Sequence, residues 1–272
     1  MDIKKIVILL LVISLAGVFL SNVEIREASL LVKNVDMAVA WGNLGHKMIE
    51  AGVIDPDKFE AIYVQRGGLT DEAKNLLYGE NNGRLVMNQD NSGVILNLLW
   101  GLGLGNANRI LTNGPMADPI YGGAGGFAST GGWTLSRGNA MDHYSQHMFF
   151  ELTEEQQELV ERVANNIYRP CCNNSTYFPD CNHGMAMLGL LELMAFNGAG
   201  EEDMYRLALQ ANTLWFPDTY AAIDQLLELK GIDPAVVGPK EILGFDFSSA
   251  SGYQQVLSQV ESKDAAGNSC GV

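Results

Sequence analysis

The chain contains few cysteines, histidines and basic side chains. Four cysteines and four histidines occur among 272 residues, and 32 acidic residues outnumber 17 lysines and arginines, for a formal net charge of −15. A chain this acidic repels phosphate groups, which argues against a surface for nucleic acid or anionic lipid. The C-x-x-C-H pattern of c-type haem attachment and the H-E-x-x-H pattern of metalloproteases are both missing. These absences exclude several common classes of binding protein and enzyme.

A hydrophobic run of full membrane-spanning length is also lacking at the N-terminus. The apolar stretch there, residues 6–20, follows two lysines and is shorter than the roughly 20 residues that span a bilayer comfortably. A charged start before such a stretch is typical of a secretory signal, although no clean A-x-A cleavage site and no cysteine for lipid attachment follow. We therefore expect residues 1–21 to be a signal peptide or an N-terminal membrane tether, and the protein to be exported to a periplasmic or extracellular location.

Helix signals recur through the rest of the chain. Asp55 before Pro56, Thr70, and Thr153 with Gln156 near the capping-box position are natural helix starts. Alternating apolar runs are scarce, so we expect a mainly α fold: an irregular helical single domain over residues 22–261, followed by a flexible tail of small and polar residues, 262–272. The predicted helices cover residues 34–51, 56–65, 71–78, 92–104, 154–168, 181–196, 201–215 and 217–230.

The segment between residues 113 and 139 breaks this helical pattern. It holds six glycines within residues 122–132 and follows no strand signal, so it does not match a phosphate-binding loop. We expect a long irregular loop. Loops of this length often form a lid or a wall of a site.

Cysteine and histidine gather in one short segment. Cys171, Cys172, Cys181 and His183 lie within thirteen residues, the last two at the start of a predicted helix that Asp180 would cap. Three cysteines and a histidine are a recognised ligand set for zinc, whereas thiolates with thioethers favour Cu(I). The paired C-x2-C units of zinc fingers are missing. A metal site is therefore our leading interpretation, based on residue types rather than on a known motif.

Two other interpretations of this segment stay open. In an exported protein a disulfide from Cys181 to Cys171 or Cys172 would staple the loop, but it would leave His183 unexplained. Cys181 at a helix N-terminus, where the helix dipole favours a thiolate, would suit a catalytic nucleophile. His183 stands two residues further along the same helix and would point away from Cys181, which weakens the catalytic interpretation.

His143 and His147 form a second candidate group. Their spacing of four places both imidazoles on one face if the segment is helical, with Asp142 able to orient or join them. We interpret the pair as completing the cysteine site or as forming a second metal or proton-transfer site. The alternative is that both are ordinary helix residues.

The sequence as a whole predicts an exported protein that binds or delivers a soft metal ion, Cu(I) or Zn(II). Each of the four histidines has a methionine within two positions, which favours copper because zinc rarely accepts a thioether. One alternative is an exported metal- or thiol-dependent hydrolase or oxidoreductase, in which His143 and His147 act with Glu192 or Asp142 beneath the glycine-rich loop. The other is a disulfide-stapled binding domain without a metal.

Overall fold

The fold is mainly helical. The computed structural model describes residue 30, residues 32–234 and residues 236–267. It is 57% helical, and the described residues contain 12 α-helices and one small two-stranded sheet, which confirms the prediction of a mainly α fold. None of these helices combines the length and the apolar character that crossing a membrane requires. The predicted signal or anchor segment, residues 1–21, lies outside the described residues.

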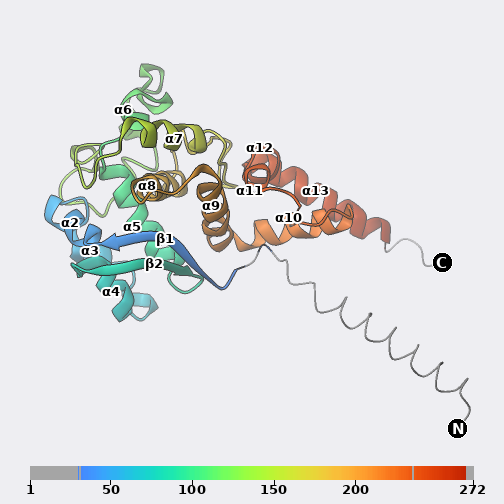
Figure 1. The fold of residues 1–272 in the computed structure, drawn as a ribbon, viewed down its shortest axis with the longest axis horizontal. Coiled ribbons are helices and arrows are strands. Elements are labelled where there is room, and N and C mark those ends of the chain that lie inside the picture. Colours follow the sequence, from blue (N-terminus) through green and yellow to red (C-terminus); the bar gives the residue numbers. More distant parts are fainter. Residues whose placement is uncertain (1–29, 31, 235, 268–272) are drawn as a thin grey trace, which may run out of the picture.

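Two extensively buried helices, α5 (Ser92–Gly105) and α8 (Asn182–Phe196), lie at the centre of the body with the sheet against them (Figure 1). Helices α10 (Pro217–Leu229) and α13 (Ala250–Gly267) extend to one side as an arm. Within the glycine-rich segment the backbone forms only short 3-10 turns, at Pro115–Ala117, Pro119–Tyr121 and Ala124–Gly126. The helices and strands are, in chain order, β1 (Asn34–Gly42), α2 (Leu44–Ala51), α3 (Pro56–Ala61), α4 (Asp71–Tyr78), β2 (Asn82–Asn88), α5 (Ser92–Gly105), α6 (Arg109–Asn113), α7 (Glu154–Ala164), α8 (Asn182–Phe196), α9 (Glu201–Trp215), α10 (Pro217–Leu229), α11 (Pro239–Ile242), α12 (Phe245–Ser248) and α13 (Ala250–Gly267).

The first part of the predicted helix 34–51 is a strand, so that prediction was wrong for residues 34–42. β1 pairs antiparallel with β2, with a register shift between Asp36 and Ala40. Alternate residues of β1 face the core, but Ala38 and Ala40 on the exposed face are apolar too and mask the period of two in the sequence. The buried face carries four large side chains: Val35, Met37, Val39 and Trp41.

Side-chain caps explain why three of the helices begin where they do. Asp55 accepts hydrogen bonds from the backbone of the first turn of α3, and Thr70 does the same for α4. Thr153 and Gln156 form a reciprocal capping box at the start of α7. Each cap satisfies backbone N–H groups that have no partner within the helix. All three predicted helix starts are confirmed.

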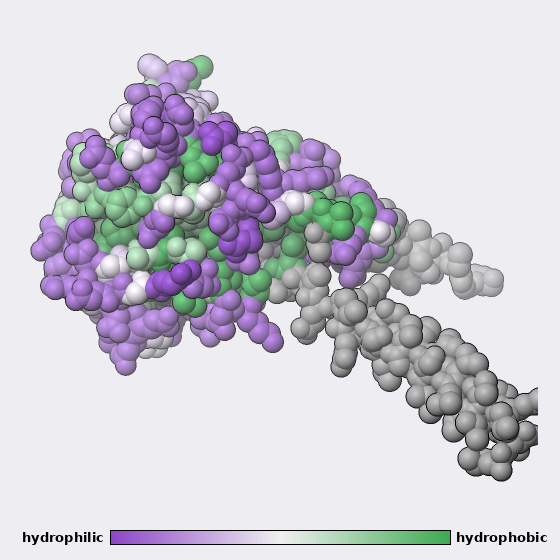
Figure 2. All heavy atoms as spheres, in the orientation of Figure 1, coloured by the Kyte–Doolittle hydropathy of each residue, from purple (hydrophilic) through white to green (hydrophobic). Residues whose placement is uncertain are grey.

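The helix α13, which the sequence analysis did not predict, reaches into the segment that we expected to be a tail. The sequence predicted a flexible tail from residue 262, but α13 continues to Gly267, and residues 268–272 lie outside the described residues. Lysine and two alanines within 262–267 favour helix and explain the extension. Apolar residues come to the surface over the arm formed by α10 and α13 (Figure 2). Leu229 and Ile232 there are 37% and 40% exposed, which is ordinary for a protein surface.

The central helices α5 and α8 pack with their backbones in direct contact. Both are buried on nearly every side within one hydrophobic core. A Cβ atom on Gly103 of α5 would collide with the carbonyl oxygen of Met185, and a Cβ on Gly189 of α8 would lie 2.5 Å from the carbonyl oxygen of Leu99. The two glycines therefore fix α8 against α5, and with it the N-terminal end of α8.

One acidic side chain lies inside this core. Glu192 of α8 is completely buried, and its Oε2 accepts a hydrogen bond of 2.7 Å from Nδ2 of Asn106, while Oε1 has no partner within hydrogen-bond distance among the described residues. Burial raises the pKa of Glu192 well above its usual value of 4.5, although the amide of Asn106 opposes the shift. Burial in the folded protein therefore favours the protonated, neutral form of this carboxyl group.

This protonation should make stability depend on pH. The folded state binds the Glu192 proton more tightly than the unfolded state, so its contribution is fully present below pH 4.5 and is lost as pH rises through the raised folded pKa. We expect Glu192→Gln to become more stable relative to the parent protein as pH rises, by at most about 1.4 kcal/mol per pH unit. Urea unfolding of both proteins at several pH values measures the difference, and Glu228→Gln, at an exposed carboxylate, controls for net charge. A pH-independent difference would contradict the prediction.

Candidate metal centre

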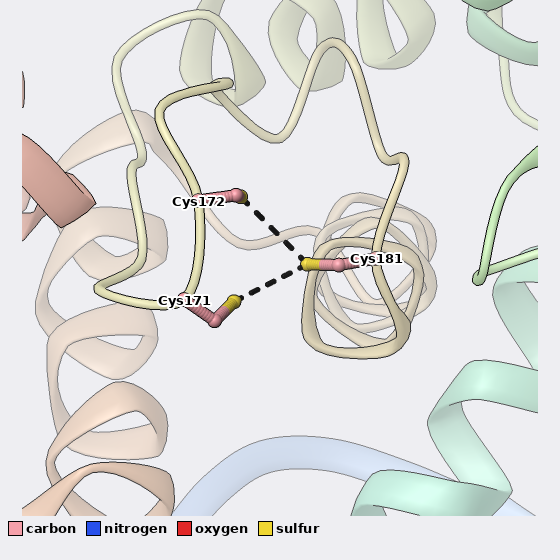
Figure 3. Close-up of side chains that lie close together, drawn as sticks. All are labelled: Cys171, Cys172 and Cys181. Carbon is pink, nitrogen blue, oxygen red and sulfur yellow. Dashed lines mark hydrogen bonds between the residues drawn. The ribbon is translucent and has the colours of Figure 1, made fainter.

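Three cysteine sulfur atoms converge at the N-terminal end of α8. Sγ of Cys181 lies 3.4 Å from Sγ of Cys171 and 3.8 Å from Sγ of Cys172, and all three sulfurs lie within 4.8 Å of one another. Figure 3 shows the three side chains pointing toward one another, two from the loop and one from the start of the helix. Sulfur ligands of a tetrahedral zinc ion, with Zn–S bonds of about 2.3 Å, lie about 3.8 Å apart. The sulfur separations are thus close to those of a shared metal ion.

Cys181 occupies the N-cap position of α8, which the sequence had assigned to Asp180. Its Sγ accepts a hydrogen bond of 3.3 Å from the backbone N–H of Gly184. The expectation that Cys181 stands at a helix N-terminus is confirmed, one position earlier than predicted. The sulfur therefore faces the positive end of the helix dipole, which favours a thiolate.

A buried arginine holds the cysteine loop in place. Arg169 is 1% exposed, and its Nε donates a hydrogen bond of 3.1 Å to Sγ of Cys181. Its two terminal nitrogens donate to the carbonyl oxygens of Asn174 and Phe178, at 3.0 and 3.2 Å. One of them also forms a 3.0 Å ion pair with Asp180. One guanidinium thus connects the loop to the start of α8, a role that we did not assign to this residue from the sequence.

The other side of the cysteine loop is attached to the beginning of α13. The carbonyl oxygen of Cys172 accepts a hydrogen bond of 2.9 Å from the backbone N–H of Ala250. Oδ1 of Asn173 accepts from both the backbone N–H and the hydroxyl of Ser251, at 2.9 and 2.7 Å. The loop is therefore held between the core helix α8 and the C-terminal arm.

The surroundings of the three thiols shift their pKa values in different directions. Hydrogen bonds from Cys171 and Cys172, together with the charge of Arg169, lower the pKa of Cys181. Contacts with Cys172 and Cys181 raise the pKa of Cys171. For Cys172, the contact with Cys171 lowers the pKa, but the contact with Cys181 and burial outweigh it and raise the pKa to about 11. Of the three cysteines, Cys181 is therefore the one whose surroundings favour the thiolate form.

His183 does not join the sulfur atoms. Its ring packs against Phe216, with centroids 4.4 Å apart, and approaches Trp215 at 6.1 Å. Its Nδ1 is buried and makes no hydrogen bond within the described part of the chain, and burial lowers its pKa. Residues two apart on a helix project to nearly opposite sides, which separates His183 from Cys181. The fourth ligand that we predicted is thus not within the cluster.

His143 and His147 contact each other, but not through a helix. The segment turns at Ser145, whose φ is 55°, and Nδ1 of His143 lies 3.0 Å from Nε2 of His147. Nε2 of His143 lies 2.8 Å from the carbonyl oxygen of Arg137. Because a carbonyl only accepts, this Nε2 carries the proton, and Nδ1 accepts from the Nε2–H of His147. Burial and the neighbouring His143 lower the pKa of His147.

The geometry of the histidine pair is that of a hydrogen bond rather than of two ligands to one ion. The two ring planes differ by only 28°, and the ring centroids are 5.3 Å apart. The N···N distance of 3.0 Å is shorter than this by about one ring radius for each imidazole, so both nitrogens lie on the line that joins the two centroids. The two nitrogens therefore face each other along the line between the rings, where no ion has room. Among the described residues, the group that could hold a metal comprises the three cysteines without either histidine.

The predicted acidic partners of the histidines have other roles. Oδ2 of Asp142 accepts a hydrogen bond of 3.3 Å from the backbone of Asn139 and closes a capping box. Glu192 is linked to the histidine segment through Asn106, whose backbone pairs with that of His147. The methionines near the candidate ligands on α8, Met185 and Met187, are both completely buried in the hydrophobic core.

The glycine-rich segment contacts the residues that directly precede Cys181. The backbone N–H of Ser129 donates a hydrogen bond of 3.1 Å to the carbonyl oxygen of Asp180, directly before Cys181. The rings of Tyr121, Phe127 and Phe178 pack edge to face, with centroids 5.2 to 5.6 Å apart. This loop therefore supports the segment that leads into the N-cap of α8.

Comparisons with known proteins found no match: no protein-family model, no curated protein and no solved structure is detectably similar to the chain. The functional argument consequently depends on the chemistry of the cysteine cluster and of its surroundings.

Proposed function

We propose that this is an exported metal-binding protein that holds a soft ion, Cu(I) or Zn(II), between Cys171, Cys172 and Cys181. The convergence of three sulfur atoms within 4.8 Å of one another is the observation that carries the proposal. Thiolates are the protein ligands that select these two ions. The role is to bind or deliver the ion, and the charged and apolar N-terminus supports a location outside the cytoplasmic membrane, reached by a signal peptide or held there by an N-terminal tether.

The surroundings of the cluster suit ion binding. The surroundings of Cys181 favour its thiolate form in the absence of an ion, and hydrogen bonds from Arg169 and from the backbone N–H of Gly184 hold its sulfur in place. Binding an ion requires the remaining thiols to lose their protons, so affinity should rise with pH. A preformed site also loses little conformational freedom on binding.

Ion content and thiol reactivity of the full chain, purified without oxygen, test the proposal. We expect one Cu(I) or Zn(II) per chain and three thiols that react slowly until a chelator is added. Cys171→Ser, Cys172→Ser and Cys181→Ser should each lower ion content, whereas Cys270→Ser, at the fourth cysteine, should not. A chain that binds neither ion, or in which two cluster thiols have paired, would reject the proposal in favour of a stapled domain.

Ion binding should also stabilise the fold. At a free ion concentration about 100 times the Kd, we expect the free energy of unfolding to rise by about 2.7 kcal/mol. Cys181→Ser should remove most of this increment because it removes the sulfur that contacts both others. Chemical unfolding with and without the ion measures the increment, and Cys270→Ser serves again as the matched control. An equal increment in the Cys181→Ser variant would place the ion elsewhere.

A further inference from the structure

We propose that the ion is Cu(I), bound by three sulfur atoms and no other donor, and that Cys171 is the ligand through which it is handed on. This inference rests on the proposed function and specifies the ion and the direction of transfer. It draws on three features of the cluster: the donor set, the fixed charge beside it and the unequal exposure of the three cysteines.

The donor set consists of sulfur alone. His183 is turned onto Phe216, and no histidine or carboxylate of the described residues joins the three cysteines. The carboxylate of Asp180, the nearest acid in sequence, is engaged by Arg169 on one oxygen and by Asn174 on the other. A structural zinc site normally has four protein ligands. Cu(I) is softer, and three thiolates complete its coordination.

The fixed charge beside the cluster also favours a monovalent ion. The guanidinium of Arg169 donates to Cys181 and is held there by Asp180, Asn174 and Phe178. Coulomb repulsion between this group and a bound ion is twice as large for Zn(II) as for Cu(I). Burial of Arg169 leaves the repulsion largely unscreened by solvent.

The three sulfurs differ in how firmly they are held. Cys181 receives hydrogen bonds from Arg169 and Gly184, and Cys172 lies partly buried with its sulfur 3.8 Å from the carbonyl oxygen of Asn174. Cys171 is exposed, and the partners described for its sulfur are the other two cysteines of the cluster. Cys171 is therefore the ligand that an incoming group can reach and displace.

The transfer that follows is a ligand exchange with a thiol-bearing acceptor. A sulfur–copper bond to the acceptor forms as the bond to Cys171 breaks, and the proton released by the acceptor thiol passes to the Cys171 sulfur. Copper stays in the +1 state throughout, so the step needs no oxidant or reductant.

Competition between the two ions tests the identity of the ion. The full chain is loaded with one equivalent of Zn(II) without oxygen and then given one equivalent of Cu(I) as its acetonitrile complex. We expect Cu(I) to displace Zn(II) completely, and X-ray absorption to show sulfur as the only type of ligand. Retention of Zn(II), or a nitrogen or oxygen ligand on copper, would overturn the inference while leaving the proposed function standing. Binding of neither ion would reject both.

The exchange role of Cys171 is tested with reduced glutathione as the acceptor. Transfer of Cu(I) from the loaded protein should be about tenfold faster in Cys171→Ser than in the parent, because the coordination position that the acceptor needs is then already open and the change appears in the dissociation rate. Cys172→Ser should accelerate transfer less, and Cys270→Ser should match the parent. Equal or greater acceleration in Cys172→Ser would assign the exchange to that cysteine and overturn this part of the inference.

Discussion

Replacing Arg169 by methionine is expected to lower the free energy of unfolding by about 3–5 kcal/mol, the range for breaking a buried charge pair. Methionine fills similar space but removes every donor that the guanidinium supplies to Cys181, Asp180 and the two loop carbonyls. The carboxylate of Asp180 and the sulfur of Cys181 would then lose a buried cation. Urea unfolding of the ion-free protein measures the loss separately from any effect of a metal.

Arg162 offers a matched control for this prediction. It forms an ion pair with Glu201 at 3.0 Å, but its side chain is 54% exposed. Exposed pairs contribute about 1 kcal/mol or less, so Arg162→Met should change stability far less than Arg169→Met. Equal effects of the two substitutions would show that the cysteine loop does not depend on the buried guanidinium.

The second large effect is expected at the contact between α5 and α8. Gly103→Ala should lower the free energy of unfolding by about 1–3 kcal/mol or more, because the added methyl group has no space against the backbone of Met185. The helices must separate to accommodate it, and the cysteine loop at the N-terminus of α8 would move with them. Chemical unfolding gives the stability, and the reactivity of the three thiols reports the movement.

Gly93 lies on the same helix, but we expect its replacement by alanine to raise the free energy of unfolding rather than to lower it. A Cβ there meets nothing within 4 Å. Gly93→Ala should therefore stabilise the protein by about 0.5–1 kcal/mol through the better helix propensity of alanine. If both substitutions stabilised the protein, the close packing of α5 on α8 would be disproved.

Local signals in the sequence were sufficient for most helices but not for the sheet. Thr70 and Thr153 cap helices through atoms of the same short segment, so nothing distant is needed to predict them. β1 depends on pairing with β2, which is separated from it in sequence by α2, α3 and α4. Such a partner is not visible locally, and the apolar Ala38 and Ala40 made the strand resemble a helix.

The types of residue in the sequence were sufficient to predict the candidate site, but they did not predict how its side chains are arranged. The prediction grouped Cys171, Cys172 and Cys181, which the structure brings together. His183 and Cys181 project from different sides of α8, so the loop that carries Cys171 and Cys172 would have to contact both sides of the helix for all four residues to meet. The rotation of successive helix residues argued against that already in the sequence.

Arg169 was overlooked because a single arginine is usually a surface residue. The available signal was its position, two residues before Cys171 in a strongly acidic chain. The contact between His143 and His147 also depended on a turn at Ser145, a residue type that seldom adopts positive φ. No pattern in the sequence indicated that turn.

The attachment of the cysteine loop to α13 makes the far end of the chain part of the candidate centre. Asn173 and Ser251 are 78 positions apart, yet their hydrogen bonds hold one side of the loop. A protein cut before residue 250 would keep all three cluster cysteines and still lose half of the scaffold around them. Proteolysis at the base of the arm would therefore change how the sulfurs are presented without touching any of them.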